Sequence, residues 1–127
     1  MNKAFVIDVP VWDSTVIVGC GDPDTKLKAL LTKYMDEDVM EDYLETCRGF
    51  GVRGCVHRVR PGEPAVLWVP KPPTDPETHG YFAHEIAHVV FSILTHKGMW
   101  HTTSSEESYT YLMQYLTKEI LIRFKKR

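Results

Sequence analysis

The sequence predicts an α+β domain in which a small, mostly antiparallel β-sheet packs on helices. Three observations favour this class: short β-branched runs occur in two pairs, helical segments separate the pairs, and two long helical segments close the chain. The 127 residues, 43% of them apolar and 25% charged, are enough for one core and too few for two ordinary domains. We therefore expect a single domain over residues 1–127.

The first half of the chain is predicted to hold two strands and two helices. The runs "AFVIDVP" (4–10) and "TVIVGC" (15–20) are rich in β-branched residues, and Pro10 marks the end or the edge of the first strand. Leucines at helical spacing predict a helix over about 24–35. The acidic segment 36–51 then intersperses acids with apolar residues, which predicts a short amphipathic helix with one solvated face.

The second half is predicted to hold a hairpin and two long helices. The β-prone runs "GCVHRVR" (54–60) and "AVLWVP" (65–70) are separated by "PGEP", a turn signal. Apolar residues at helical spacing then predict helices over about 75–97 and 104–125. The first of these is so apolar that we expect it to be a central helix, packed on several sides.

Composition excludes several classes of function. A formal net charge of -2 gives no basic surface for nucleic acid, and no apolar run approaches the roughly 20 residues of a membrane-spanning helix. The N-terminal apolar run is too short for a secretory signal, so we expect a cytoplasmic protein. The three cysteines form no C-x-x-C pair, which favours reduced, buried thiols over a disulfide framework or a zinc site.

The segment "HEIAH" (84–88) indicates a metal site. Residues four apart lie one turn above each other on a helix, so His84 and His88 can direct two imidazoles at one point. Glu85 flanks that face, where a carboxylate can take a proton from a metal-bound water. An apolar helix would not otherwise favour two stacked imidazoles beside an acid.

Two histidines do not complete a zinc site, so a third ligand is needed. Glu107 and Glu106, at the start of the last predicted helix, return to the pair if the two long helices form an antiparallel hairpin. Ser104 and Glu107 also match a capping box, which needs no metal. His101, His79 or water are the remaining alternatives.

The second half of the chain resembles the gluzincin branch of zinc metallopeptidases, and more closely the small zincin-like proteins encoded by bacteriophages and prophages. The likeness rests on "AVLWVP", "HEIAH" and "ESYTYL" and covers roughly residues 65–120. It implies a Zn²⁺ ion held by His84, His88 and Glu107, with Glu85 as the general base. It also implies that an edge strand, residues 65–69, lies beside the cleft and receives an extended peptide or protein substrate.

The chain departs from large gluzincins because it ends soon after the third-ligand helix and lacks their second lobe. A group that stabilises the tetrahedral intermediate is therefore not assigned by the resemblance. Tyr111 lies one turn after Glu107 on the same face, so its phenol is a candidate for that role, although it can equally be a packing residue.

These observations lead to two expectations of function. The first is a zinc-dependent peptidase, active on peptide or protein substrates in the bacterial host cell if the chain is phage-encoded. The alternative is a non-catalytic, metal-stabilised binding protein, for example a phage factor that docks on a host protein. Two imidazoles and a carboxylate also accept Co²⁺ or Fe²⁺. Neither the oligomeric state nor the substrate follows from the sequence.

Overall fold

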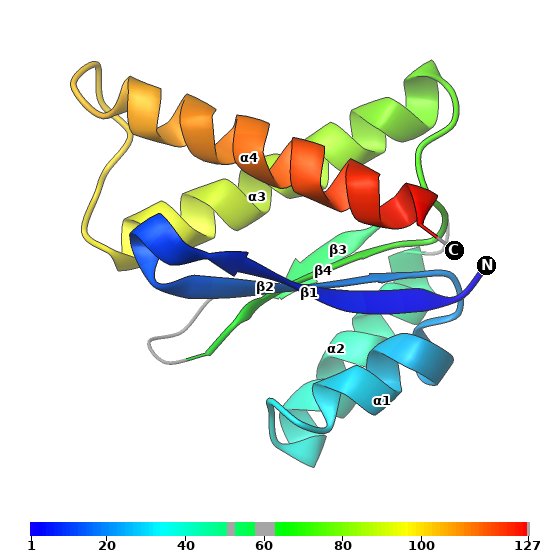
Figure 1. The fold of residues 1–127 in the computed structure, drawn as a ribbon. Coiled ribbons are helices and arrows are strands. Elements are labelled where there is room, and N and C mark those ends of the chain that lie inside the picture. Colours follow the sequence, from blue (N-terminus) through cyan, green and yellow to red (C-terminus); the bar gives the residue numbers. More distant parts are fainter. Residues whose placement is uncertain (51–52, 58–62, 127) are drawn as a thin grey trace.

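A computed structural model describes residues 1–50, 53–57 and 63–126, and shows a mixed four-stranded sheet between two pairs of helices (Figure 1). The spatial order is β1-β2-β4-β3. β1 with β2 and β3 with β4 pair antiparallel, whereas β2 and β4 pair parallel. The strands are β1 (Lys3–Val9), β2 (Ser14–Cys20), β3 (Cys55–His57) and β4 (Ala65–Val69).

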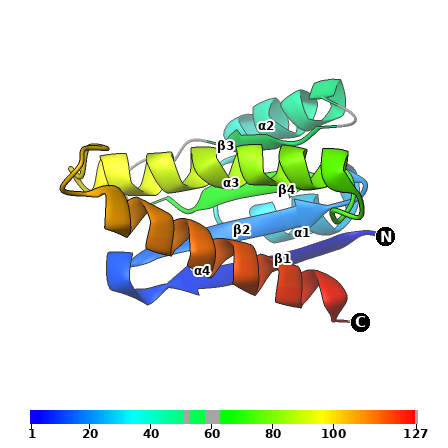
Figure 2. The ribbon, with the colours of Figure 1, turned by 90° about the horizontal axis from the view of Figure 1, so that it is seen from above.

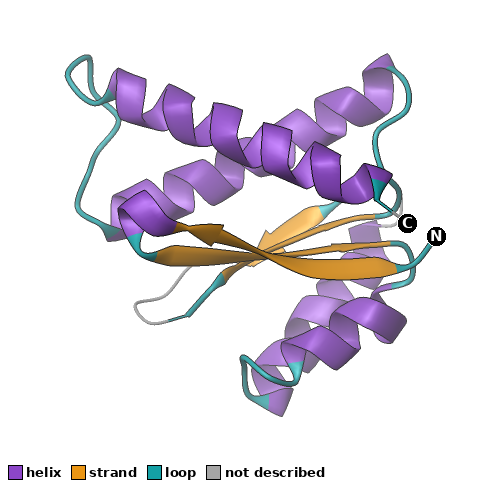
Figure 3. Ribbon diagram, viewed as in Figure 1, coloured by secondary structure: helices purple, strands orange, loops and turns teal. Residues whose placement is uncertain are grey.

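Each face of the sheet is covered by two helices (Figure 3). α1 (Lys28–Leu31) and α2 (Glu37–Phe50) pack on one face, and α3 (Pro76–His96) and α4 (Glu106–Lys125) on the other. Seen from above, α3 lies between α4 and the side of the sheet that carries β3, while α4 lies toward β1 (Figure 2). The predicted α+β class is confirmed at this level.

The two central strands are buried on both faces. All five residues of β4 and residues 16–18 and 20 of β2 are at most 3% exposed. Alternate side chains enter opposite cores: Val18 and Leu67 join the α3–α4 side, whereas Ile17 and Val66 join the α1–α2 side. This two-sided burial explains why the run 65–69 is apolar without alternation.

One sequence expectation is wrong, and a second is met only in part. The edge strand beside the cleft is β3 and not residues 65–69, because β4 is paired on both sides. The helix expected over 24–35 forms over 23–31 and ends early. It consists of a π-helical turn, η2 (Pro23–Leu27), and the short α1. In η2, Leu27 packs so closely on Gly19 that a Cβ there would come within 2.8 Å of its side chain.

The boundaries of the long helices follow their capping residues. Asp75 caps α3, since its carboxylate accepts from the backbone N–H of Thr78, and Pro76 occupies the first turn. Gly98, with φ of +79°, follows the last residues of α3. The N-cap of α4 is Ser105, so the Ser104–Glu107 capping box does not form. Among the helices of the described residues, none combines the length and apolar character that crossing a bilayer requires.

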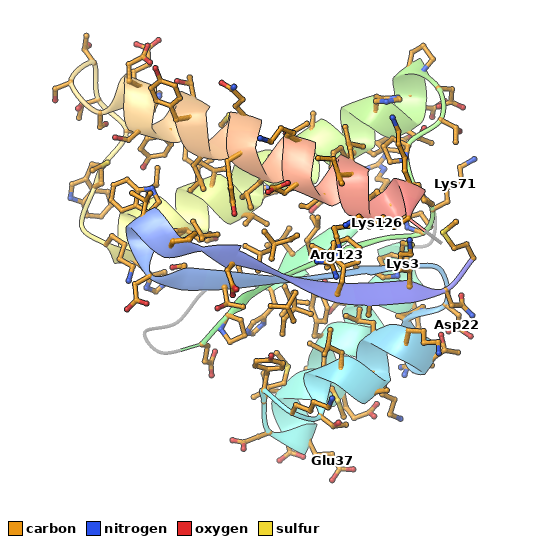
Figure 4. All side chains as sticks on the ribbon, viewed as in Figure 1. Lys3, Asp22, Glu37, Lys71, Arg123 and Lys126 are labelled. Carbon is orange, nitrogen blue, oxygen red and sulfur yellow. The ribbon has the colours of Figure 1, made fainter. Side chains whose placement is uncertain are left out.

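The first strand is tied to the last helix by Lys3. Its Nζ donates to the carbonyl of Arg123 at 2.7 Å, and also to those of Phe124 and Lys126, at the end of α4 (Figure 4). Carbonyls in the last turn of a helix lack the usual partners four residues on, although the Arg123 carbonyl also accepts from the N–H of Lys126, and they lie at the negative end of the helix dipole. Lys3 therefore caps α4 from a residue more than 100 positions away.

We expect Lys3→Met to lower the free energy of unfolding by about 1–2 kcal/mol, because the last carbonyls of α4 lose a charged donor. Urea denaturation followed by circular dichroism measures the change. Lys33→Met, at an exposed lysine after α1, is the matched control and should change it by less than about 0.5 kcal/mol. Equal losses in the two variants would contradict the capping role.

Candidate active site

His84 and His88 lie on an exposed face of α3, and their rings converge. The two Nε2 atoms are 3.1 Å apart, and the ring centroids are 4.7 Å apart at an interplanar angle of 74°. Without a metal, the contact is a hydrogen bond in which one imidazole donates to the other. Two nitrogens that share one tetrahedral zinc lie roughly 3.3 Å apart, from Zn–N bonds of about 2.05 Å. The observed separation is close to that value.

Glu85 lies beside the pair but faces inward. Its residue is 7% exposed, and its Oε1 lies 4.0 Å from the Nε2 of His84. Burial raises the pKa of Glu85 above its ordinary value, while the charges of His84 and His88 act in the opposite direction. A carboxylate in this environment is a stronger base than one in open solvent.

A groove runs along α3 at the histidines. Its larger hollow, of about 430 Å³, lies between α3 and β3, and a smaller hollow of about 230 Å³ shares Gly54, His84 and Glu85 with it. Phe91 and Thr95 line the larger end, and Arg53 and Tyr81 line the smaller one. His84 and Glu85 therefore occupy the middle of a continuous groove. The wall opposite α3 is formed by the start of the edge strand β3.

Gly54 allows β3 to approach the catalytic candidate closely. Its φ is +141°, and a Cβ at this position would lie 2.7 Å from the carbonyl oxygen of Trp68 and 3.2 Å from the Cγ of Glu85. A side chain would therefore push the edge strand away from α3. Glycine at this position keeps Glu85 buried against the strand.

The structure does not place Glu107 beside the two histidines. Glu107 precedes the buried Tyr109 by two residues, about 200° around the helix, so it points away from the packed face of α4. In addition, α4 packs over β1 at the opposite edge of the sheet from β3, and α3 stands between (Figure 2). Neither Glu106 nor Glu107 lines the groove.

The other candidates from the sequence also lie outside the pair. Tyr111 is exposed and lines a separate hollow with the 3-10 helix η1 (Pro10–Trp12). The ring of His101 packs on Phe91 and Tyr109, with centroids 5.9 and 4.9 Å away. The Nδ1 of His79 lies 2.8 Å from the carbonyl oxygen of Asp75 in its own first turn. None of these side chains joins His84 and His88.

The ligand set for a metal is consequently incomplete. Over residues 1–50, 53–57 and 63–126, no group of three or more His, Cys, Asp or Glu side chains is arranged to hold an ion. The positions outside these ranges are glycine, valine, arginine and proline, none of which is a usual metal ligand. The two imidazoles fit zinc, and the part of the chain that the structure describes does not supply the remaining ligands in this arrangement.

Several groove residues were not predicted from the sequence. Gly54 is the most informative, since a glycine next to a short strand is a recognised sign of close backbone approach. Phe91 and Arg53 can be identified as groove residues only from the folded structure. Phe91 continues the face of α3 that carries His88, and Arg53 precedes the edge strand. No spacing rule connects them in sequence.

Comparison with protein-family models, with curated proteins and with solved structures gives no match for this chain.

We expect Gly54→Ala to destabilise the fold by about 1–3 kcal/mol, because alanine is strained at a positive φ and meets Trp68 and Glu85. Gly49→Ala in α2 is the matched control: a Cβ there has no neighbour within 4 Å, so the helix should gain about 0.5–1 kcal/mol. Thermal unfolding compares the two. A gain in both would show that β3 does not need the close approach.

Proposed function

We propose that this chain is a zinc-dependent peptidase whose active site is the groove between α3 and β3. The observation that supports it is the convergence of the His84 and His88 Nε2 atoms, 3.1 Å apart, beside the buried carboxylate of Glu85. A site for structural zinc has no use for an adjacent base and is closed by four protein ligands. Two imidazoles, one base and an open groove suit hydrolysis better.

Each residue of the pair and the base has a distinct role. His84 and His88 would hold the ion by Nε2, and zinc bound there supplies a Lewis acid that lowers the pKa of a coordinated water. Glu85 would accept a proton from the attacking water and return it to the leaving amine nitrogen. Its burial against Gly54 fixes the carboxylate on the groove side of α3.

The substrate class follows from the shape of the groove. β3 is an edge strand, so an extended peptide can add to it by backbone hydrogen bonds while its scissile carbonyl lies over His84 and Glu85. Phe91 provides an apolar wall at one end, and Arg53 provides a cation at the other. Arg53 takes the place of Tyr111 as the candidate that stabilises a developing oxyanion, because it lines the groove.

A second candidate is peptide binding without cleavage. The incomplete ligand set favours it, since two histidines alone hold zinc weakly, whereas the edge strand and the groove remain able to bind an extended segment.

We expect the metal-free chain to take up one Zn²⁺, measured by calorimetric titration. His84→Ala and His88→Ala should each weaken binding at least about 100-fold, because losing merely a hydrogen-bond partner of a ligand already costs about 10–100-fold. His79→Ala, on the same helix but bonded to its own backbone, is the control and should bind as the wild type does. Loss of binding in all three variants, or in none, would contradict the assignment.

The position of Glu107 can be tested in the same titration. From its place on the outward side of α4, Glu107→Ala should leave zinc affinity unchanged. A large loss would mean that α4 rearranges to complete the site.

We expect Glu85→Gln to retain zinc affinity but to lose about 10²–10⁴-fold in kcat/KM on a peptide library, because the base is removed and the ligands are kept. Glu106→Gln, at an exposed carboxylate on α4, is the control and should keep full activity. Product analysis by mass spectrometry measures both.

The binding role would replace the peptidase if the wild type took up zinc and captured peptides without cleaving them, and if Phe91→Ala weakened that capture. Cleavage that survives in Glu85→Gln would remove Glu85 from the mechanism.

A further inference from the structure

Two cysteines from different elements meet at the back of the groove. Cys47 of α2 and Cys55 of β3 are both free thiols, and their Sγ atoms are 3.0 Å apart. They are eight residues apart in sequence, and they belong to the core between the sheet and the α1–α2 layer. A disulfide bond is about 2.05 Å long, so closing one requires the two sulfurs to approach by only about 1 Å.

The backbone around the two thiols is held in register. The hydroxyl of Tyr43, one helical turn before Cys47, donates to the carbonyl oxygen of Cys55 at 2.9 Å. On its other side, Cys55 is paired with Trp68 of β4. The strand is therefore fixed to α2 and to the sheet at the position where the sulfurs meet.

The two thiols differ in access. Cys47 is fully buried, whereas Cys55 is 6% exposed and lines the larger hollow of the groove, together with Glu85 and His88. Of the two residues, only Cys55 borders the groove, so it is the one closer to a small solute that enters there. This is the arrangement of an attacking thiol in front of a resolving thiol.

We infer that Cys47 and Cys55 form a redox-active dithiol, which a hydroperoxide entering the groove converts reversibly into a disulfide between α2 and the edge strand β3. The inference does not depend on the peptidase proposal, because it uses neither a metal nor the base. It concerns the wall of the same groove.

The reaction balances with hydrogen peroxide as the oxidant. The Cys55 sulfur attacks one peroxide oxygen, the O–O bond breaks, and hydroxide leaves, so that Cys55 becomes a sulfenic acid. The Cys47 sulfur then attacks the Cys55 sulfur, the S–O bond breaks, and hydroxide leaves again. The two thiol protons convert both hydroxides to water. The sulfurs lose two electrons in total, and the peroxide gains them.

The environment favours Cys55 as the attacking group. The contact between the two sulfurs, in which either thiol can donate, lowers the pKa of Cys55, whereas the same contact and burial raise the pKa of Cys47. The thiolate is the reactive form of cysteine. The lowered pKa of Cys55 and its place beside the groove therefore both favour Cys55 as the attacking residue. Cys47 reacts second, because the sulfenic sulfur lies beside it.

Cys20 provides the matched control. It is also a buried free thiol, but it lies on β2 and faces the α3–α4 side of the sheet. Burial raises the pKa of Cys20, and it does not line the groove. Simple exposure to oxidant should therefore leave it reduced while the pair reacts.

The test is limited oxidation of the folded full chain with one to two equivalents of hydrogen peroxide, followed by alkylation and intact mass measurement. We expect the free thiols to fall from three to one, with the loss of two hydrogens, and to return with a dithiol reductant. Digestion should yield one cross-linked peptide pair containing Cys47 and Cys55. Cys20→Ala should behave identically, apart from its missing thiol.

A trapping experiment covers the case in which a variant folds poorly. In Cys47→Ala, checked by circular dichroism, a sulfenic-acid probe should label Cys55 and no disulfide should form. In the wild type, peptide mapping alone shows whether the disulfide joins Cys47 to Cys55. Oxygen addition without a cross-link, dimers joined through Cys55, or reaction of Cys20 at the rate of the pair would each overturn the inference.

Discussion

The structure depends on the burial of β2 and β4 on both faces. Because side chains of these two parallel strands enter opposite cores, helices have to cover both sides of the sheet, and the antiparallel β1 and β3 are left at its edges. α3 packs on one of these faces near the β3 edge. That placement turns His84 and His88 toward an open groove, while Glu85 is buried against the start of the edge strand. The position of α3 near the β3 edge thus determines which of these side chains face the groove and which are buried.

Much of the secondary structure could be predicted from local patterns, because β-branched runs, Asp75–Pro76 and Gly98 act within a few residues of where they stand. The apolar run 65–69 is a central strand and not the expected edge strand, and its lack of polar alternation is the local pattern that indicates burial on both faces. The helix expected over 24–35 is confirmed over its first part but ends at Leu31, and it begins as a π-helical turn in which Leu27 packs closely on Gly19, a tertiary contact that local spacing does not reveal.

The candidate site also has a part that could be predicted from the sequence and a part that could not. The convergence of His84 and His88 follows from helical spacing alone, and the structure has it. The position of Glu107 depends on the rotation of α4 and on its lateral placement over β1, which contacts of Phe124 with Phe5 and of Tyr115 with Asp8 determine. Neither contact leaves a signal near the motif. The position of a ligand from a second helix therefore could not be predicted without knowledge of the packing. The resemblance implied that Glu107 lies beside His84 and His88, whereas α4 holds it elsewhere.

The tie between Lys3 and the end of α4 has a consequence for the order of folding. β1 pairs with the neighbouring β2, but Lys3 and Phe5 contact Arg123 and Phe124 of α4, more than 100 positions later in the sequence. Contacts between such distant positions require a long loop to close before they form, so they form late relative to local pairings. Until α4 docks, the apolar side of α3 that it covers is open to solvent. Detachment of α4 therefore exposes a hydrophobic helix face, the kind of surface through which partly folded chains associate.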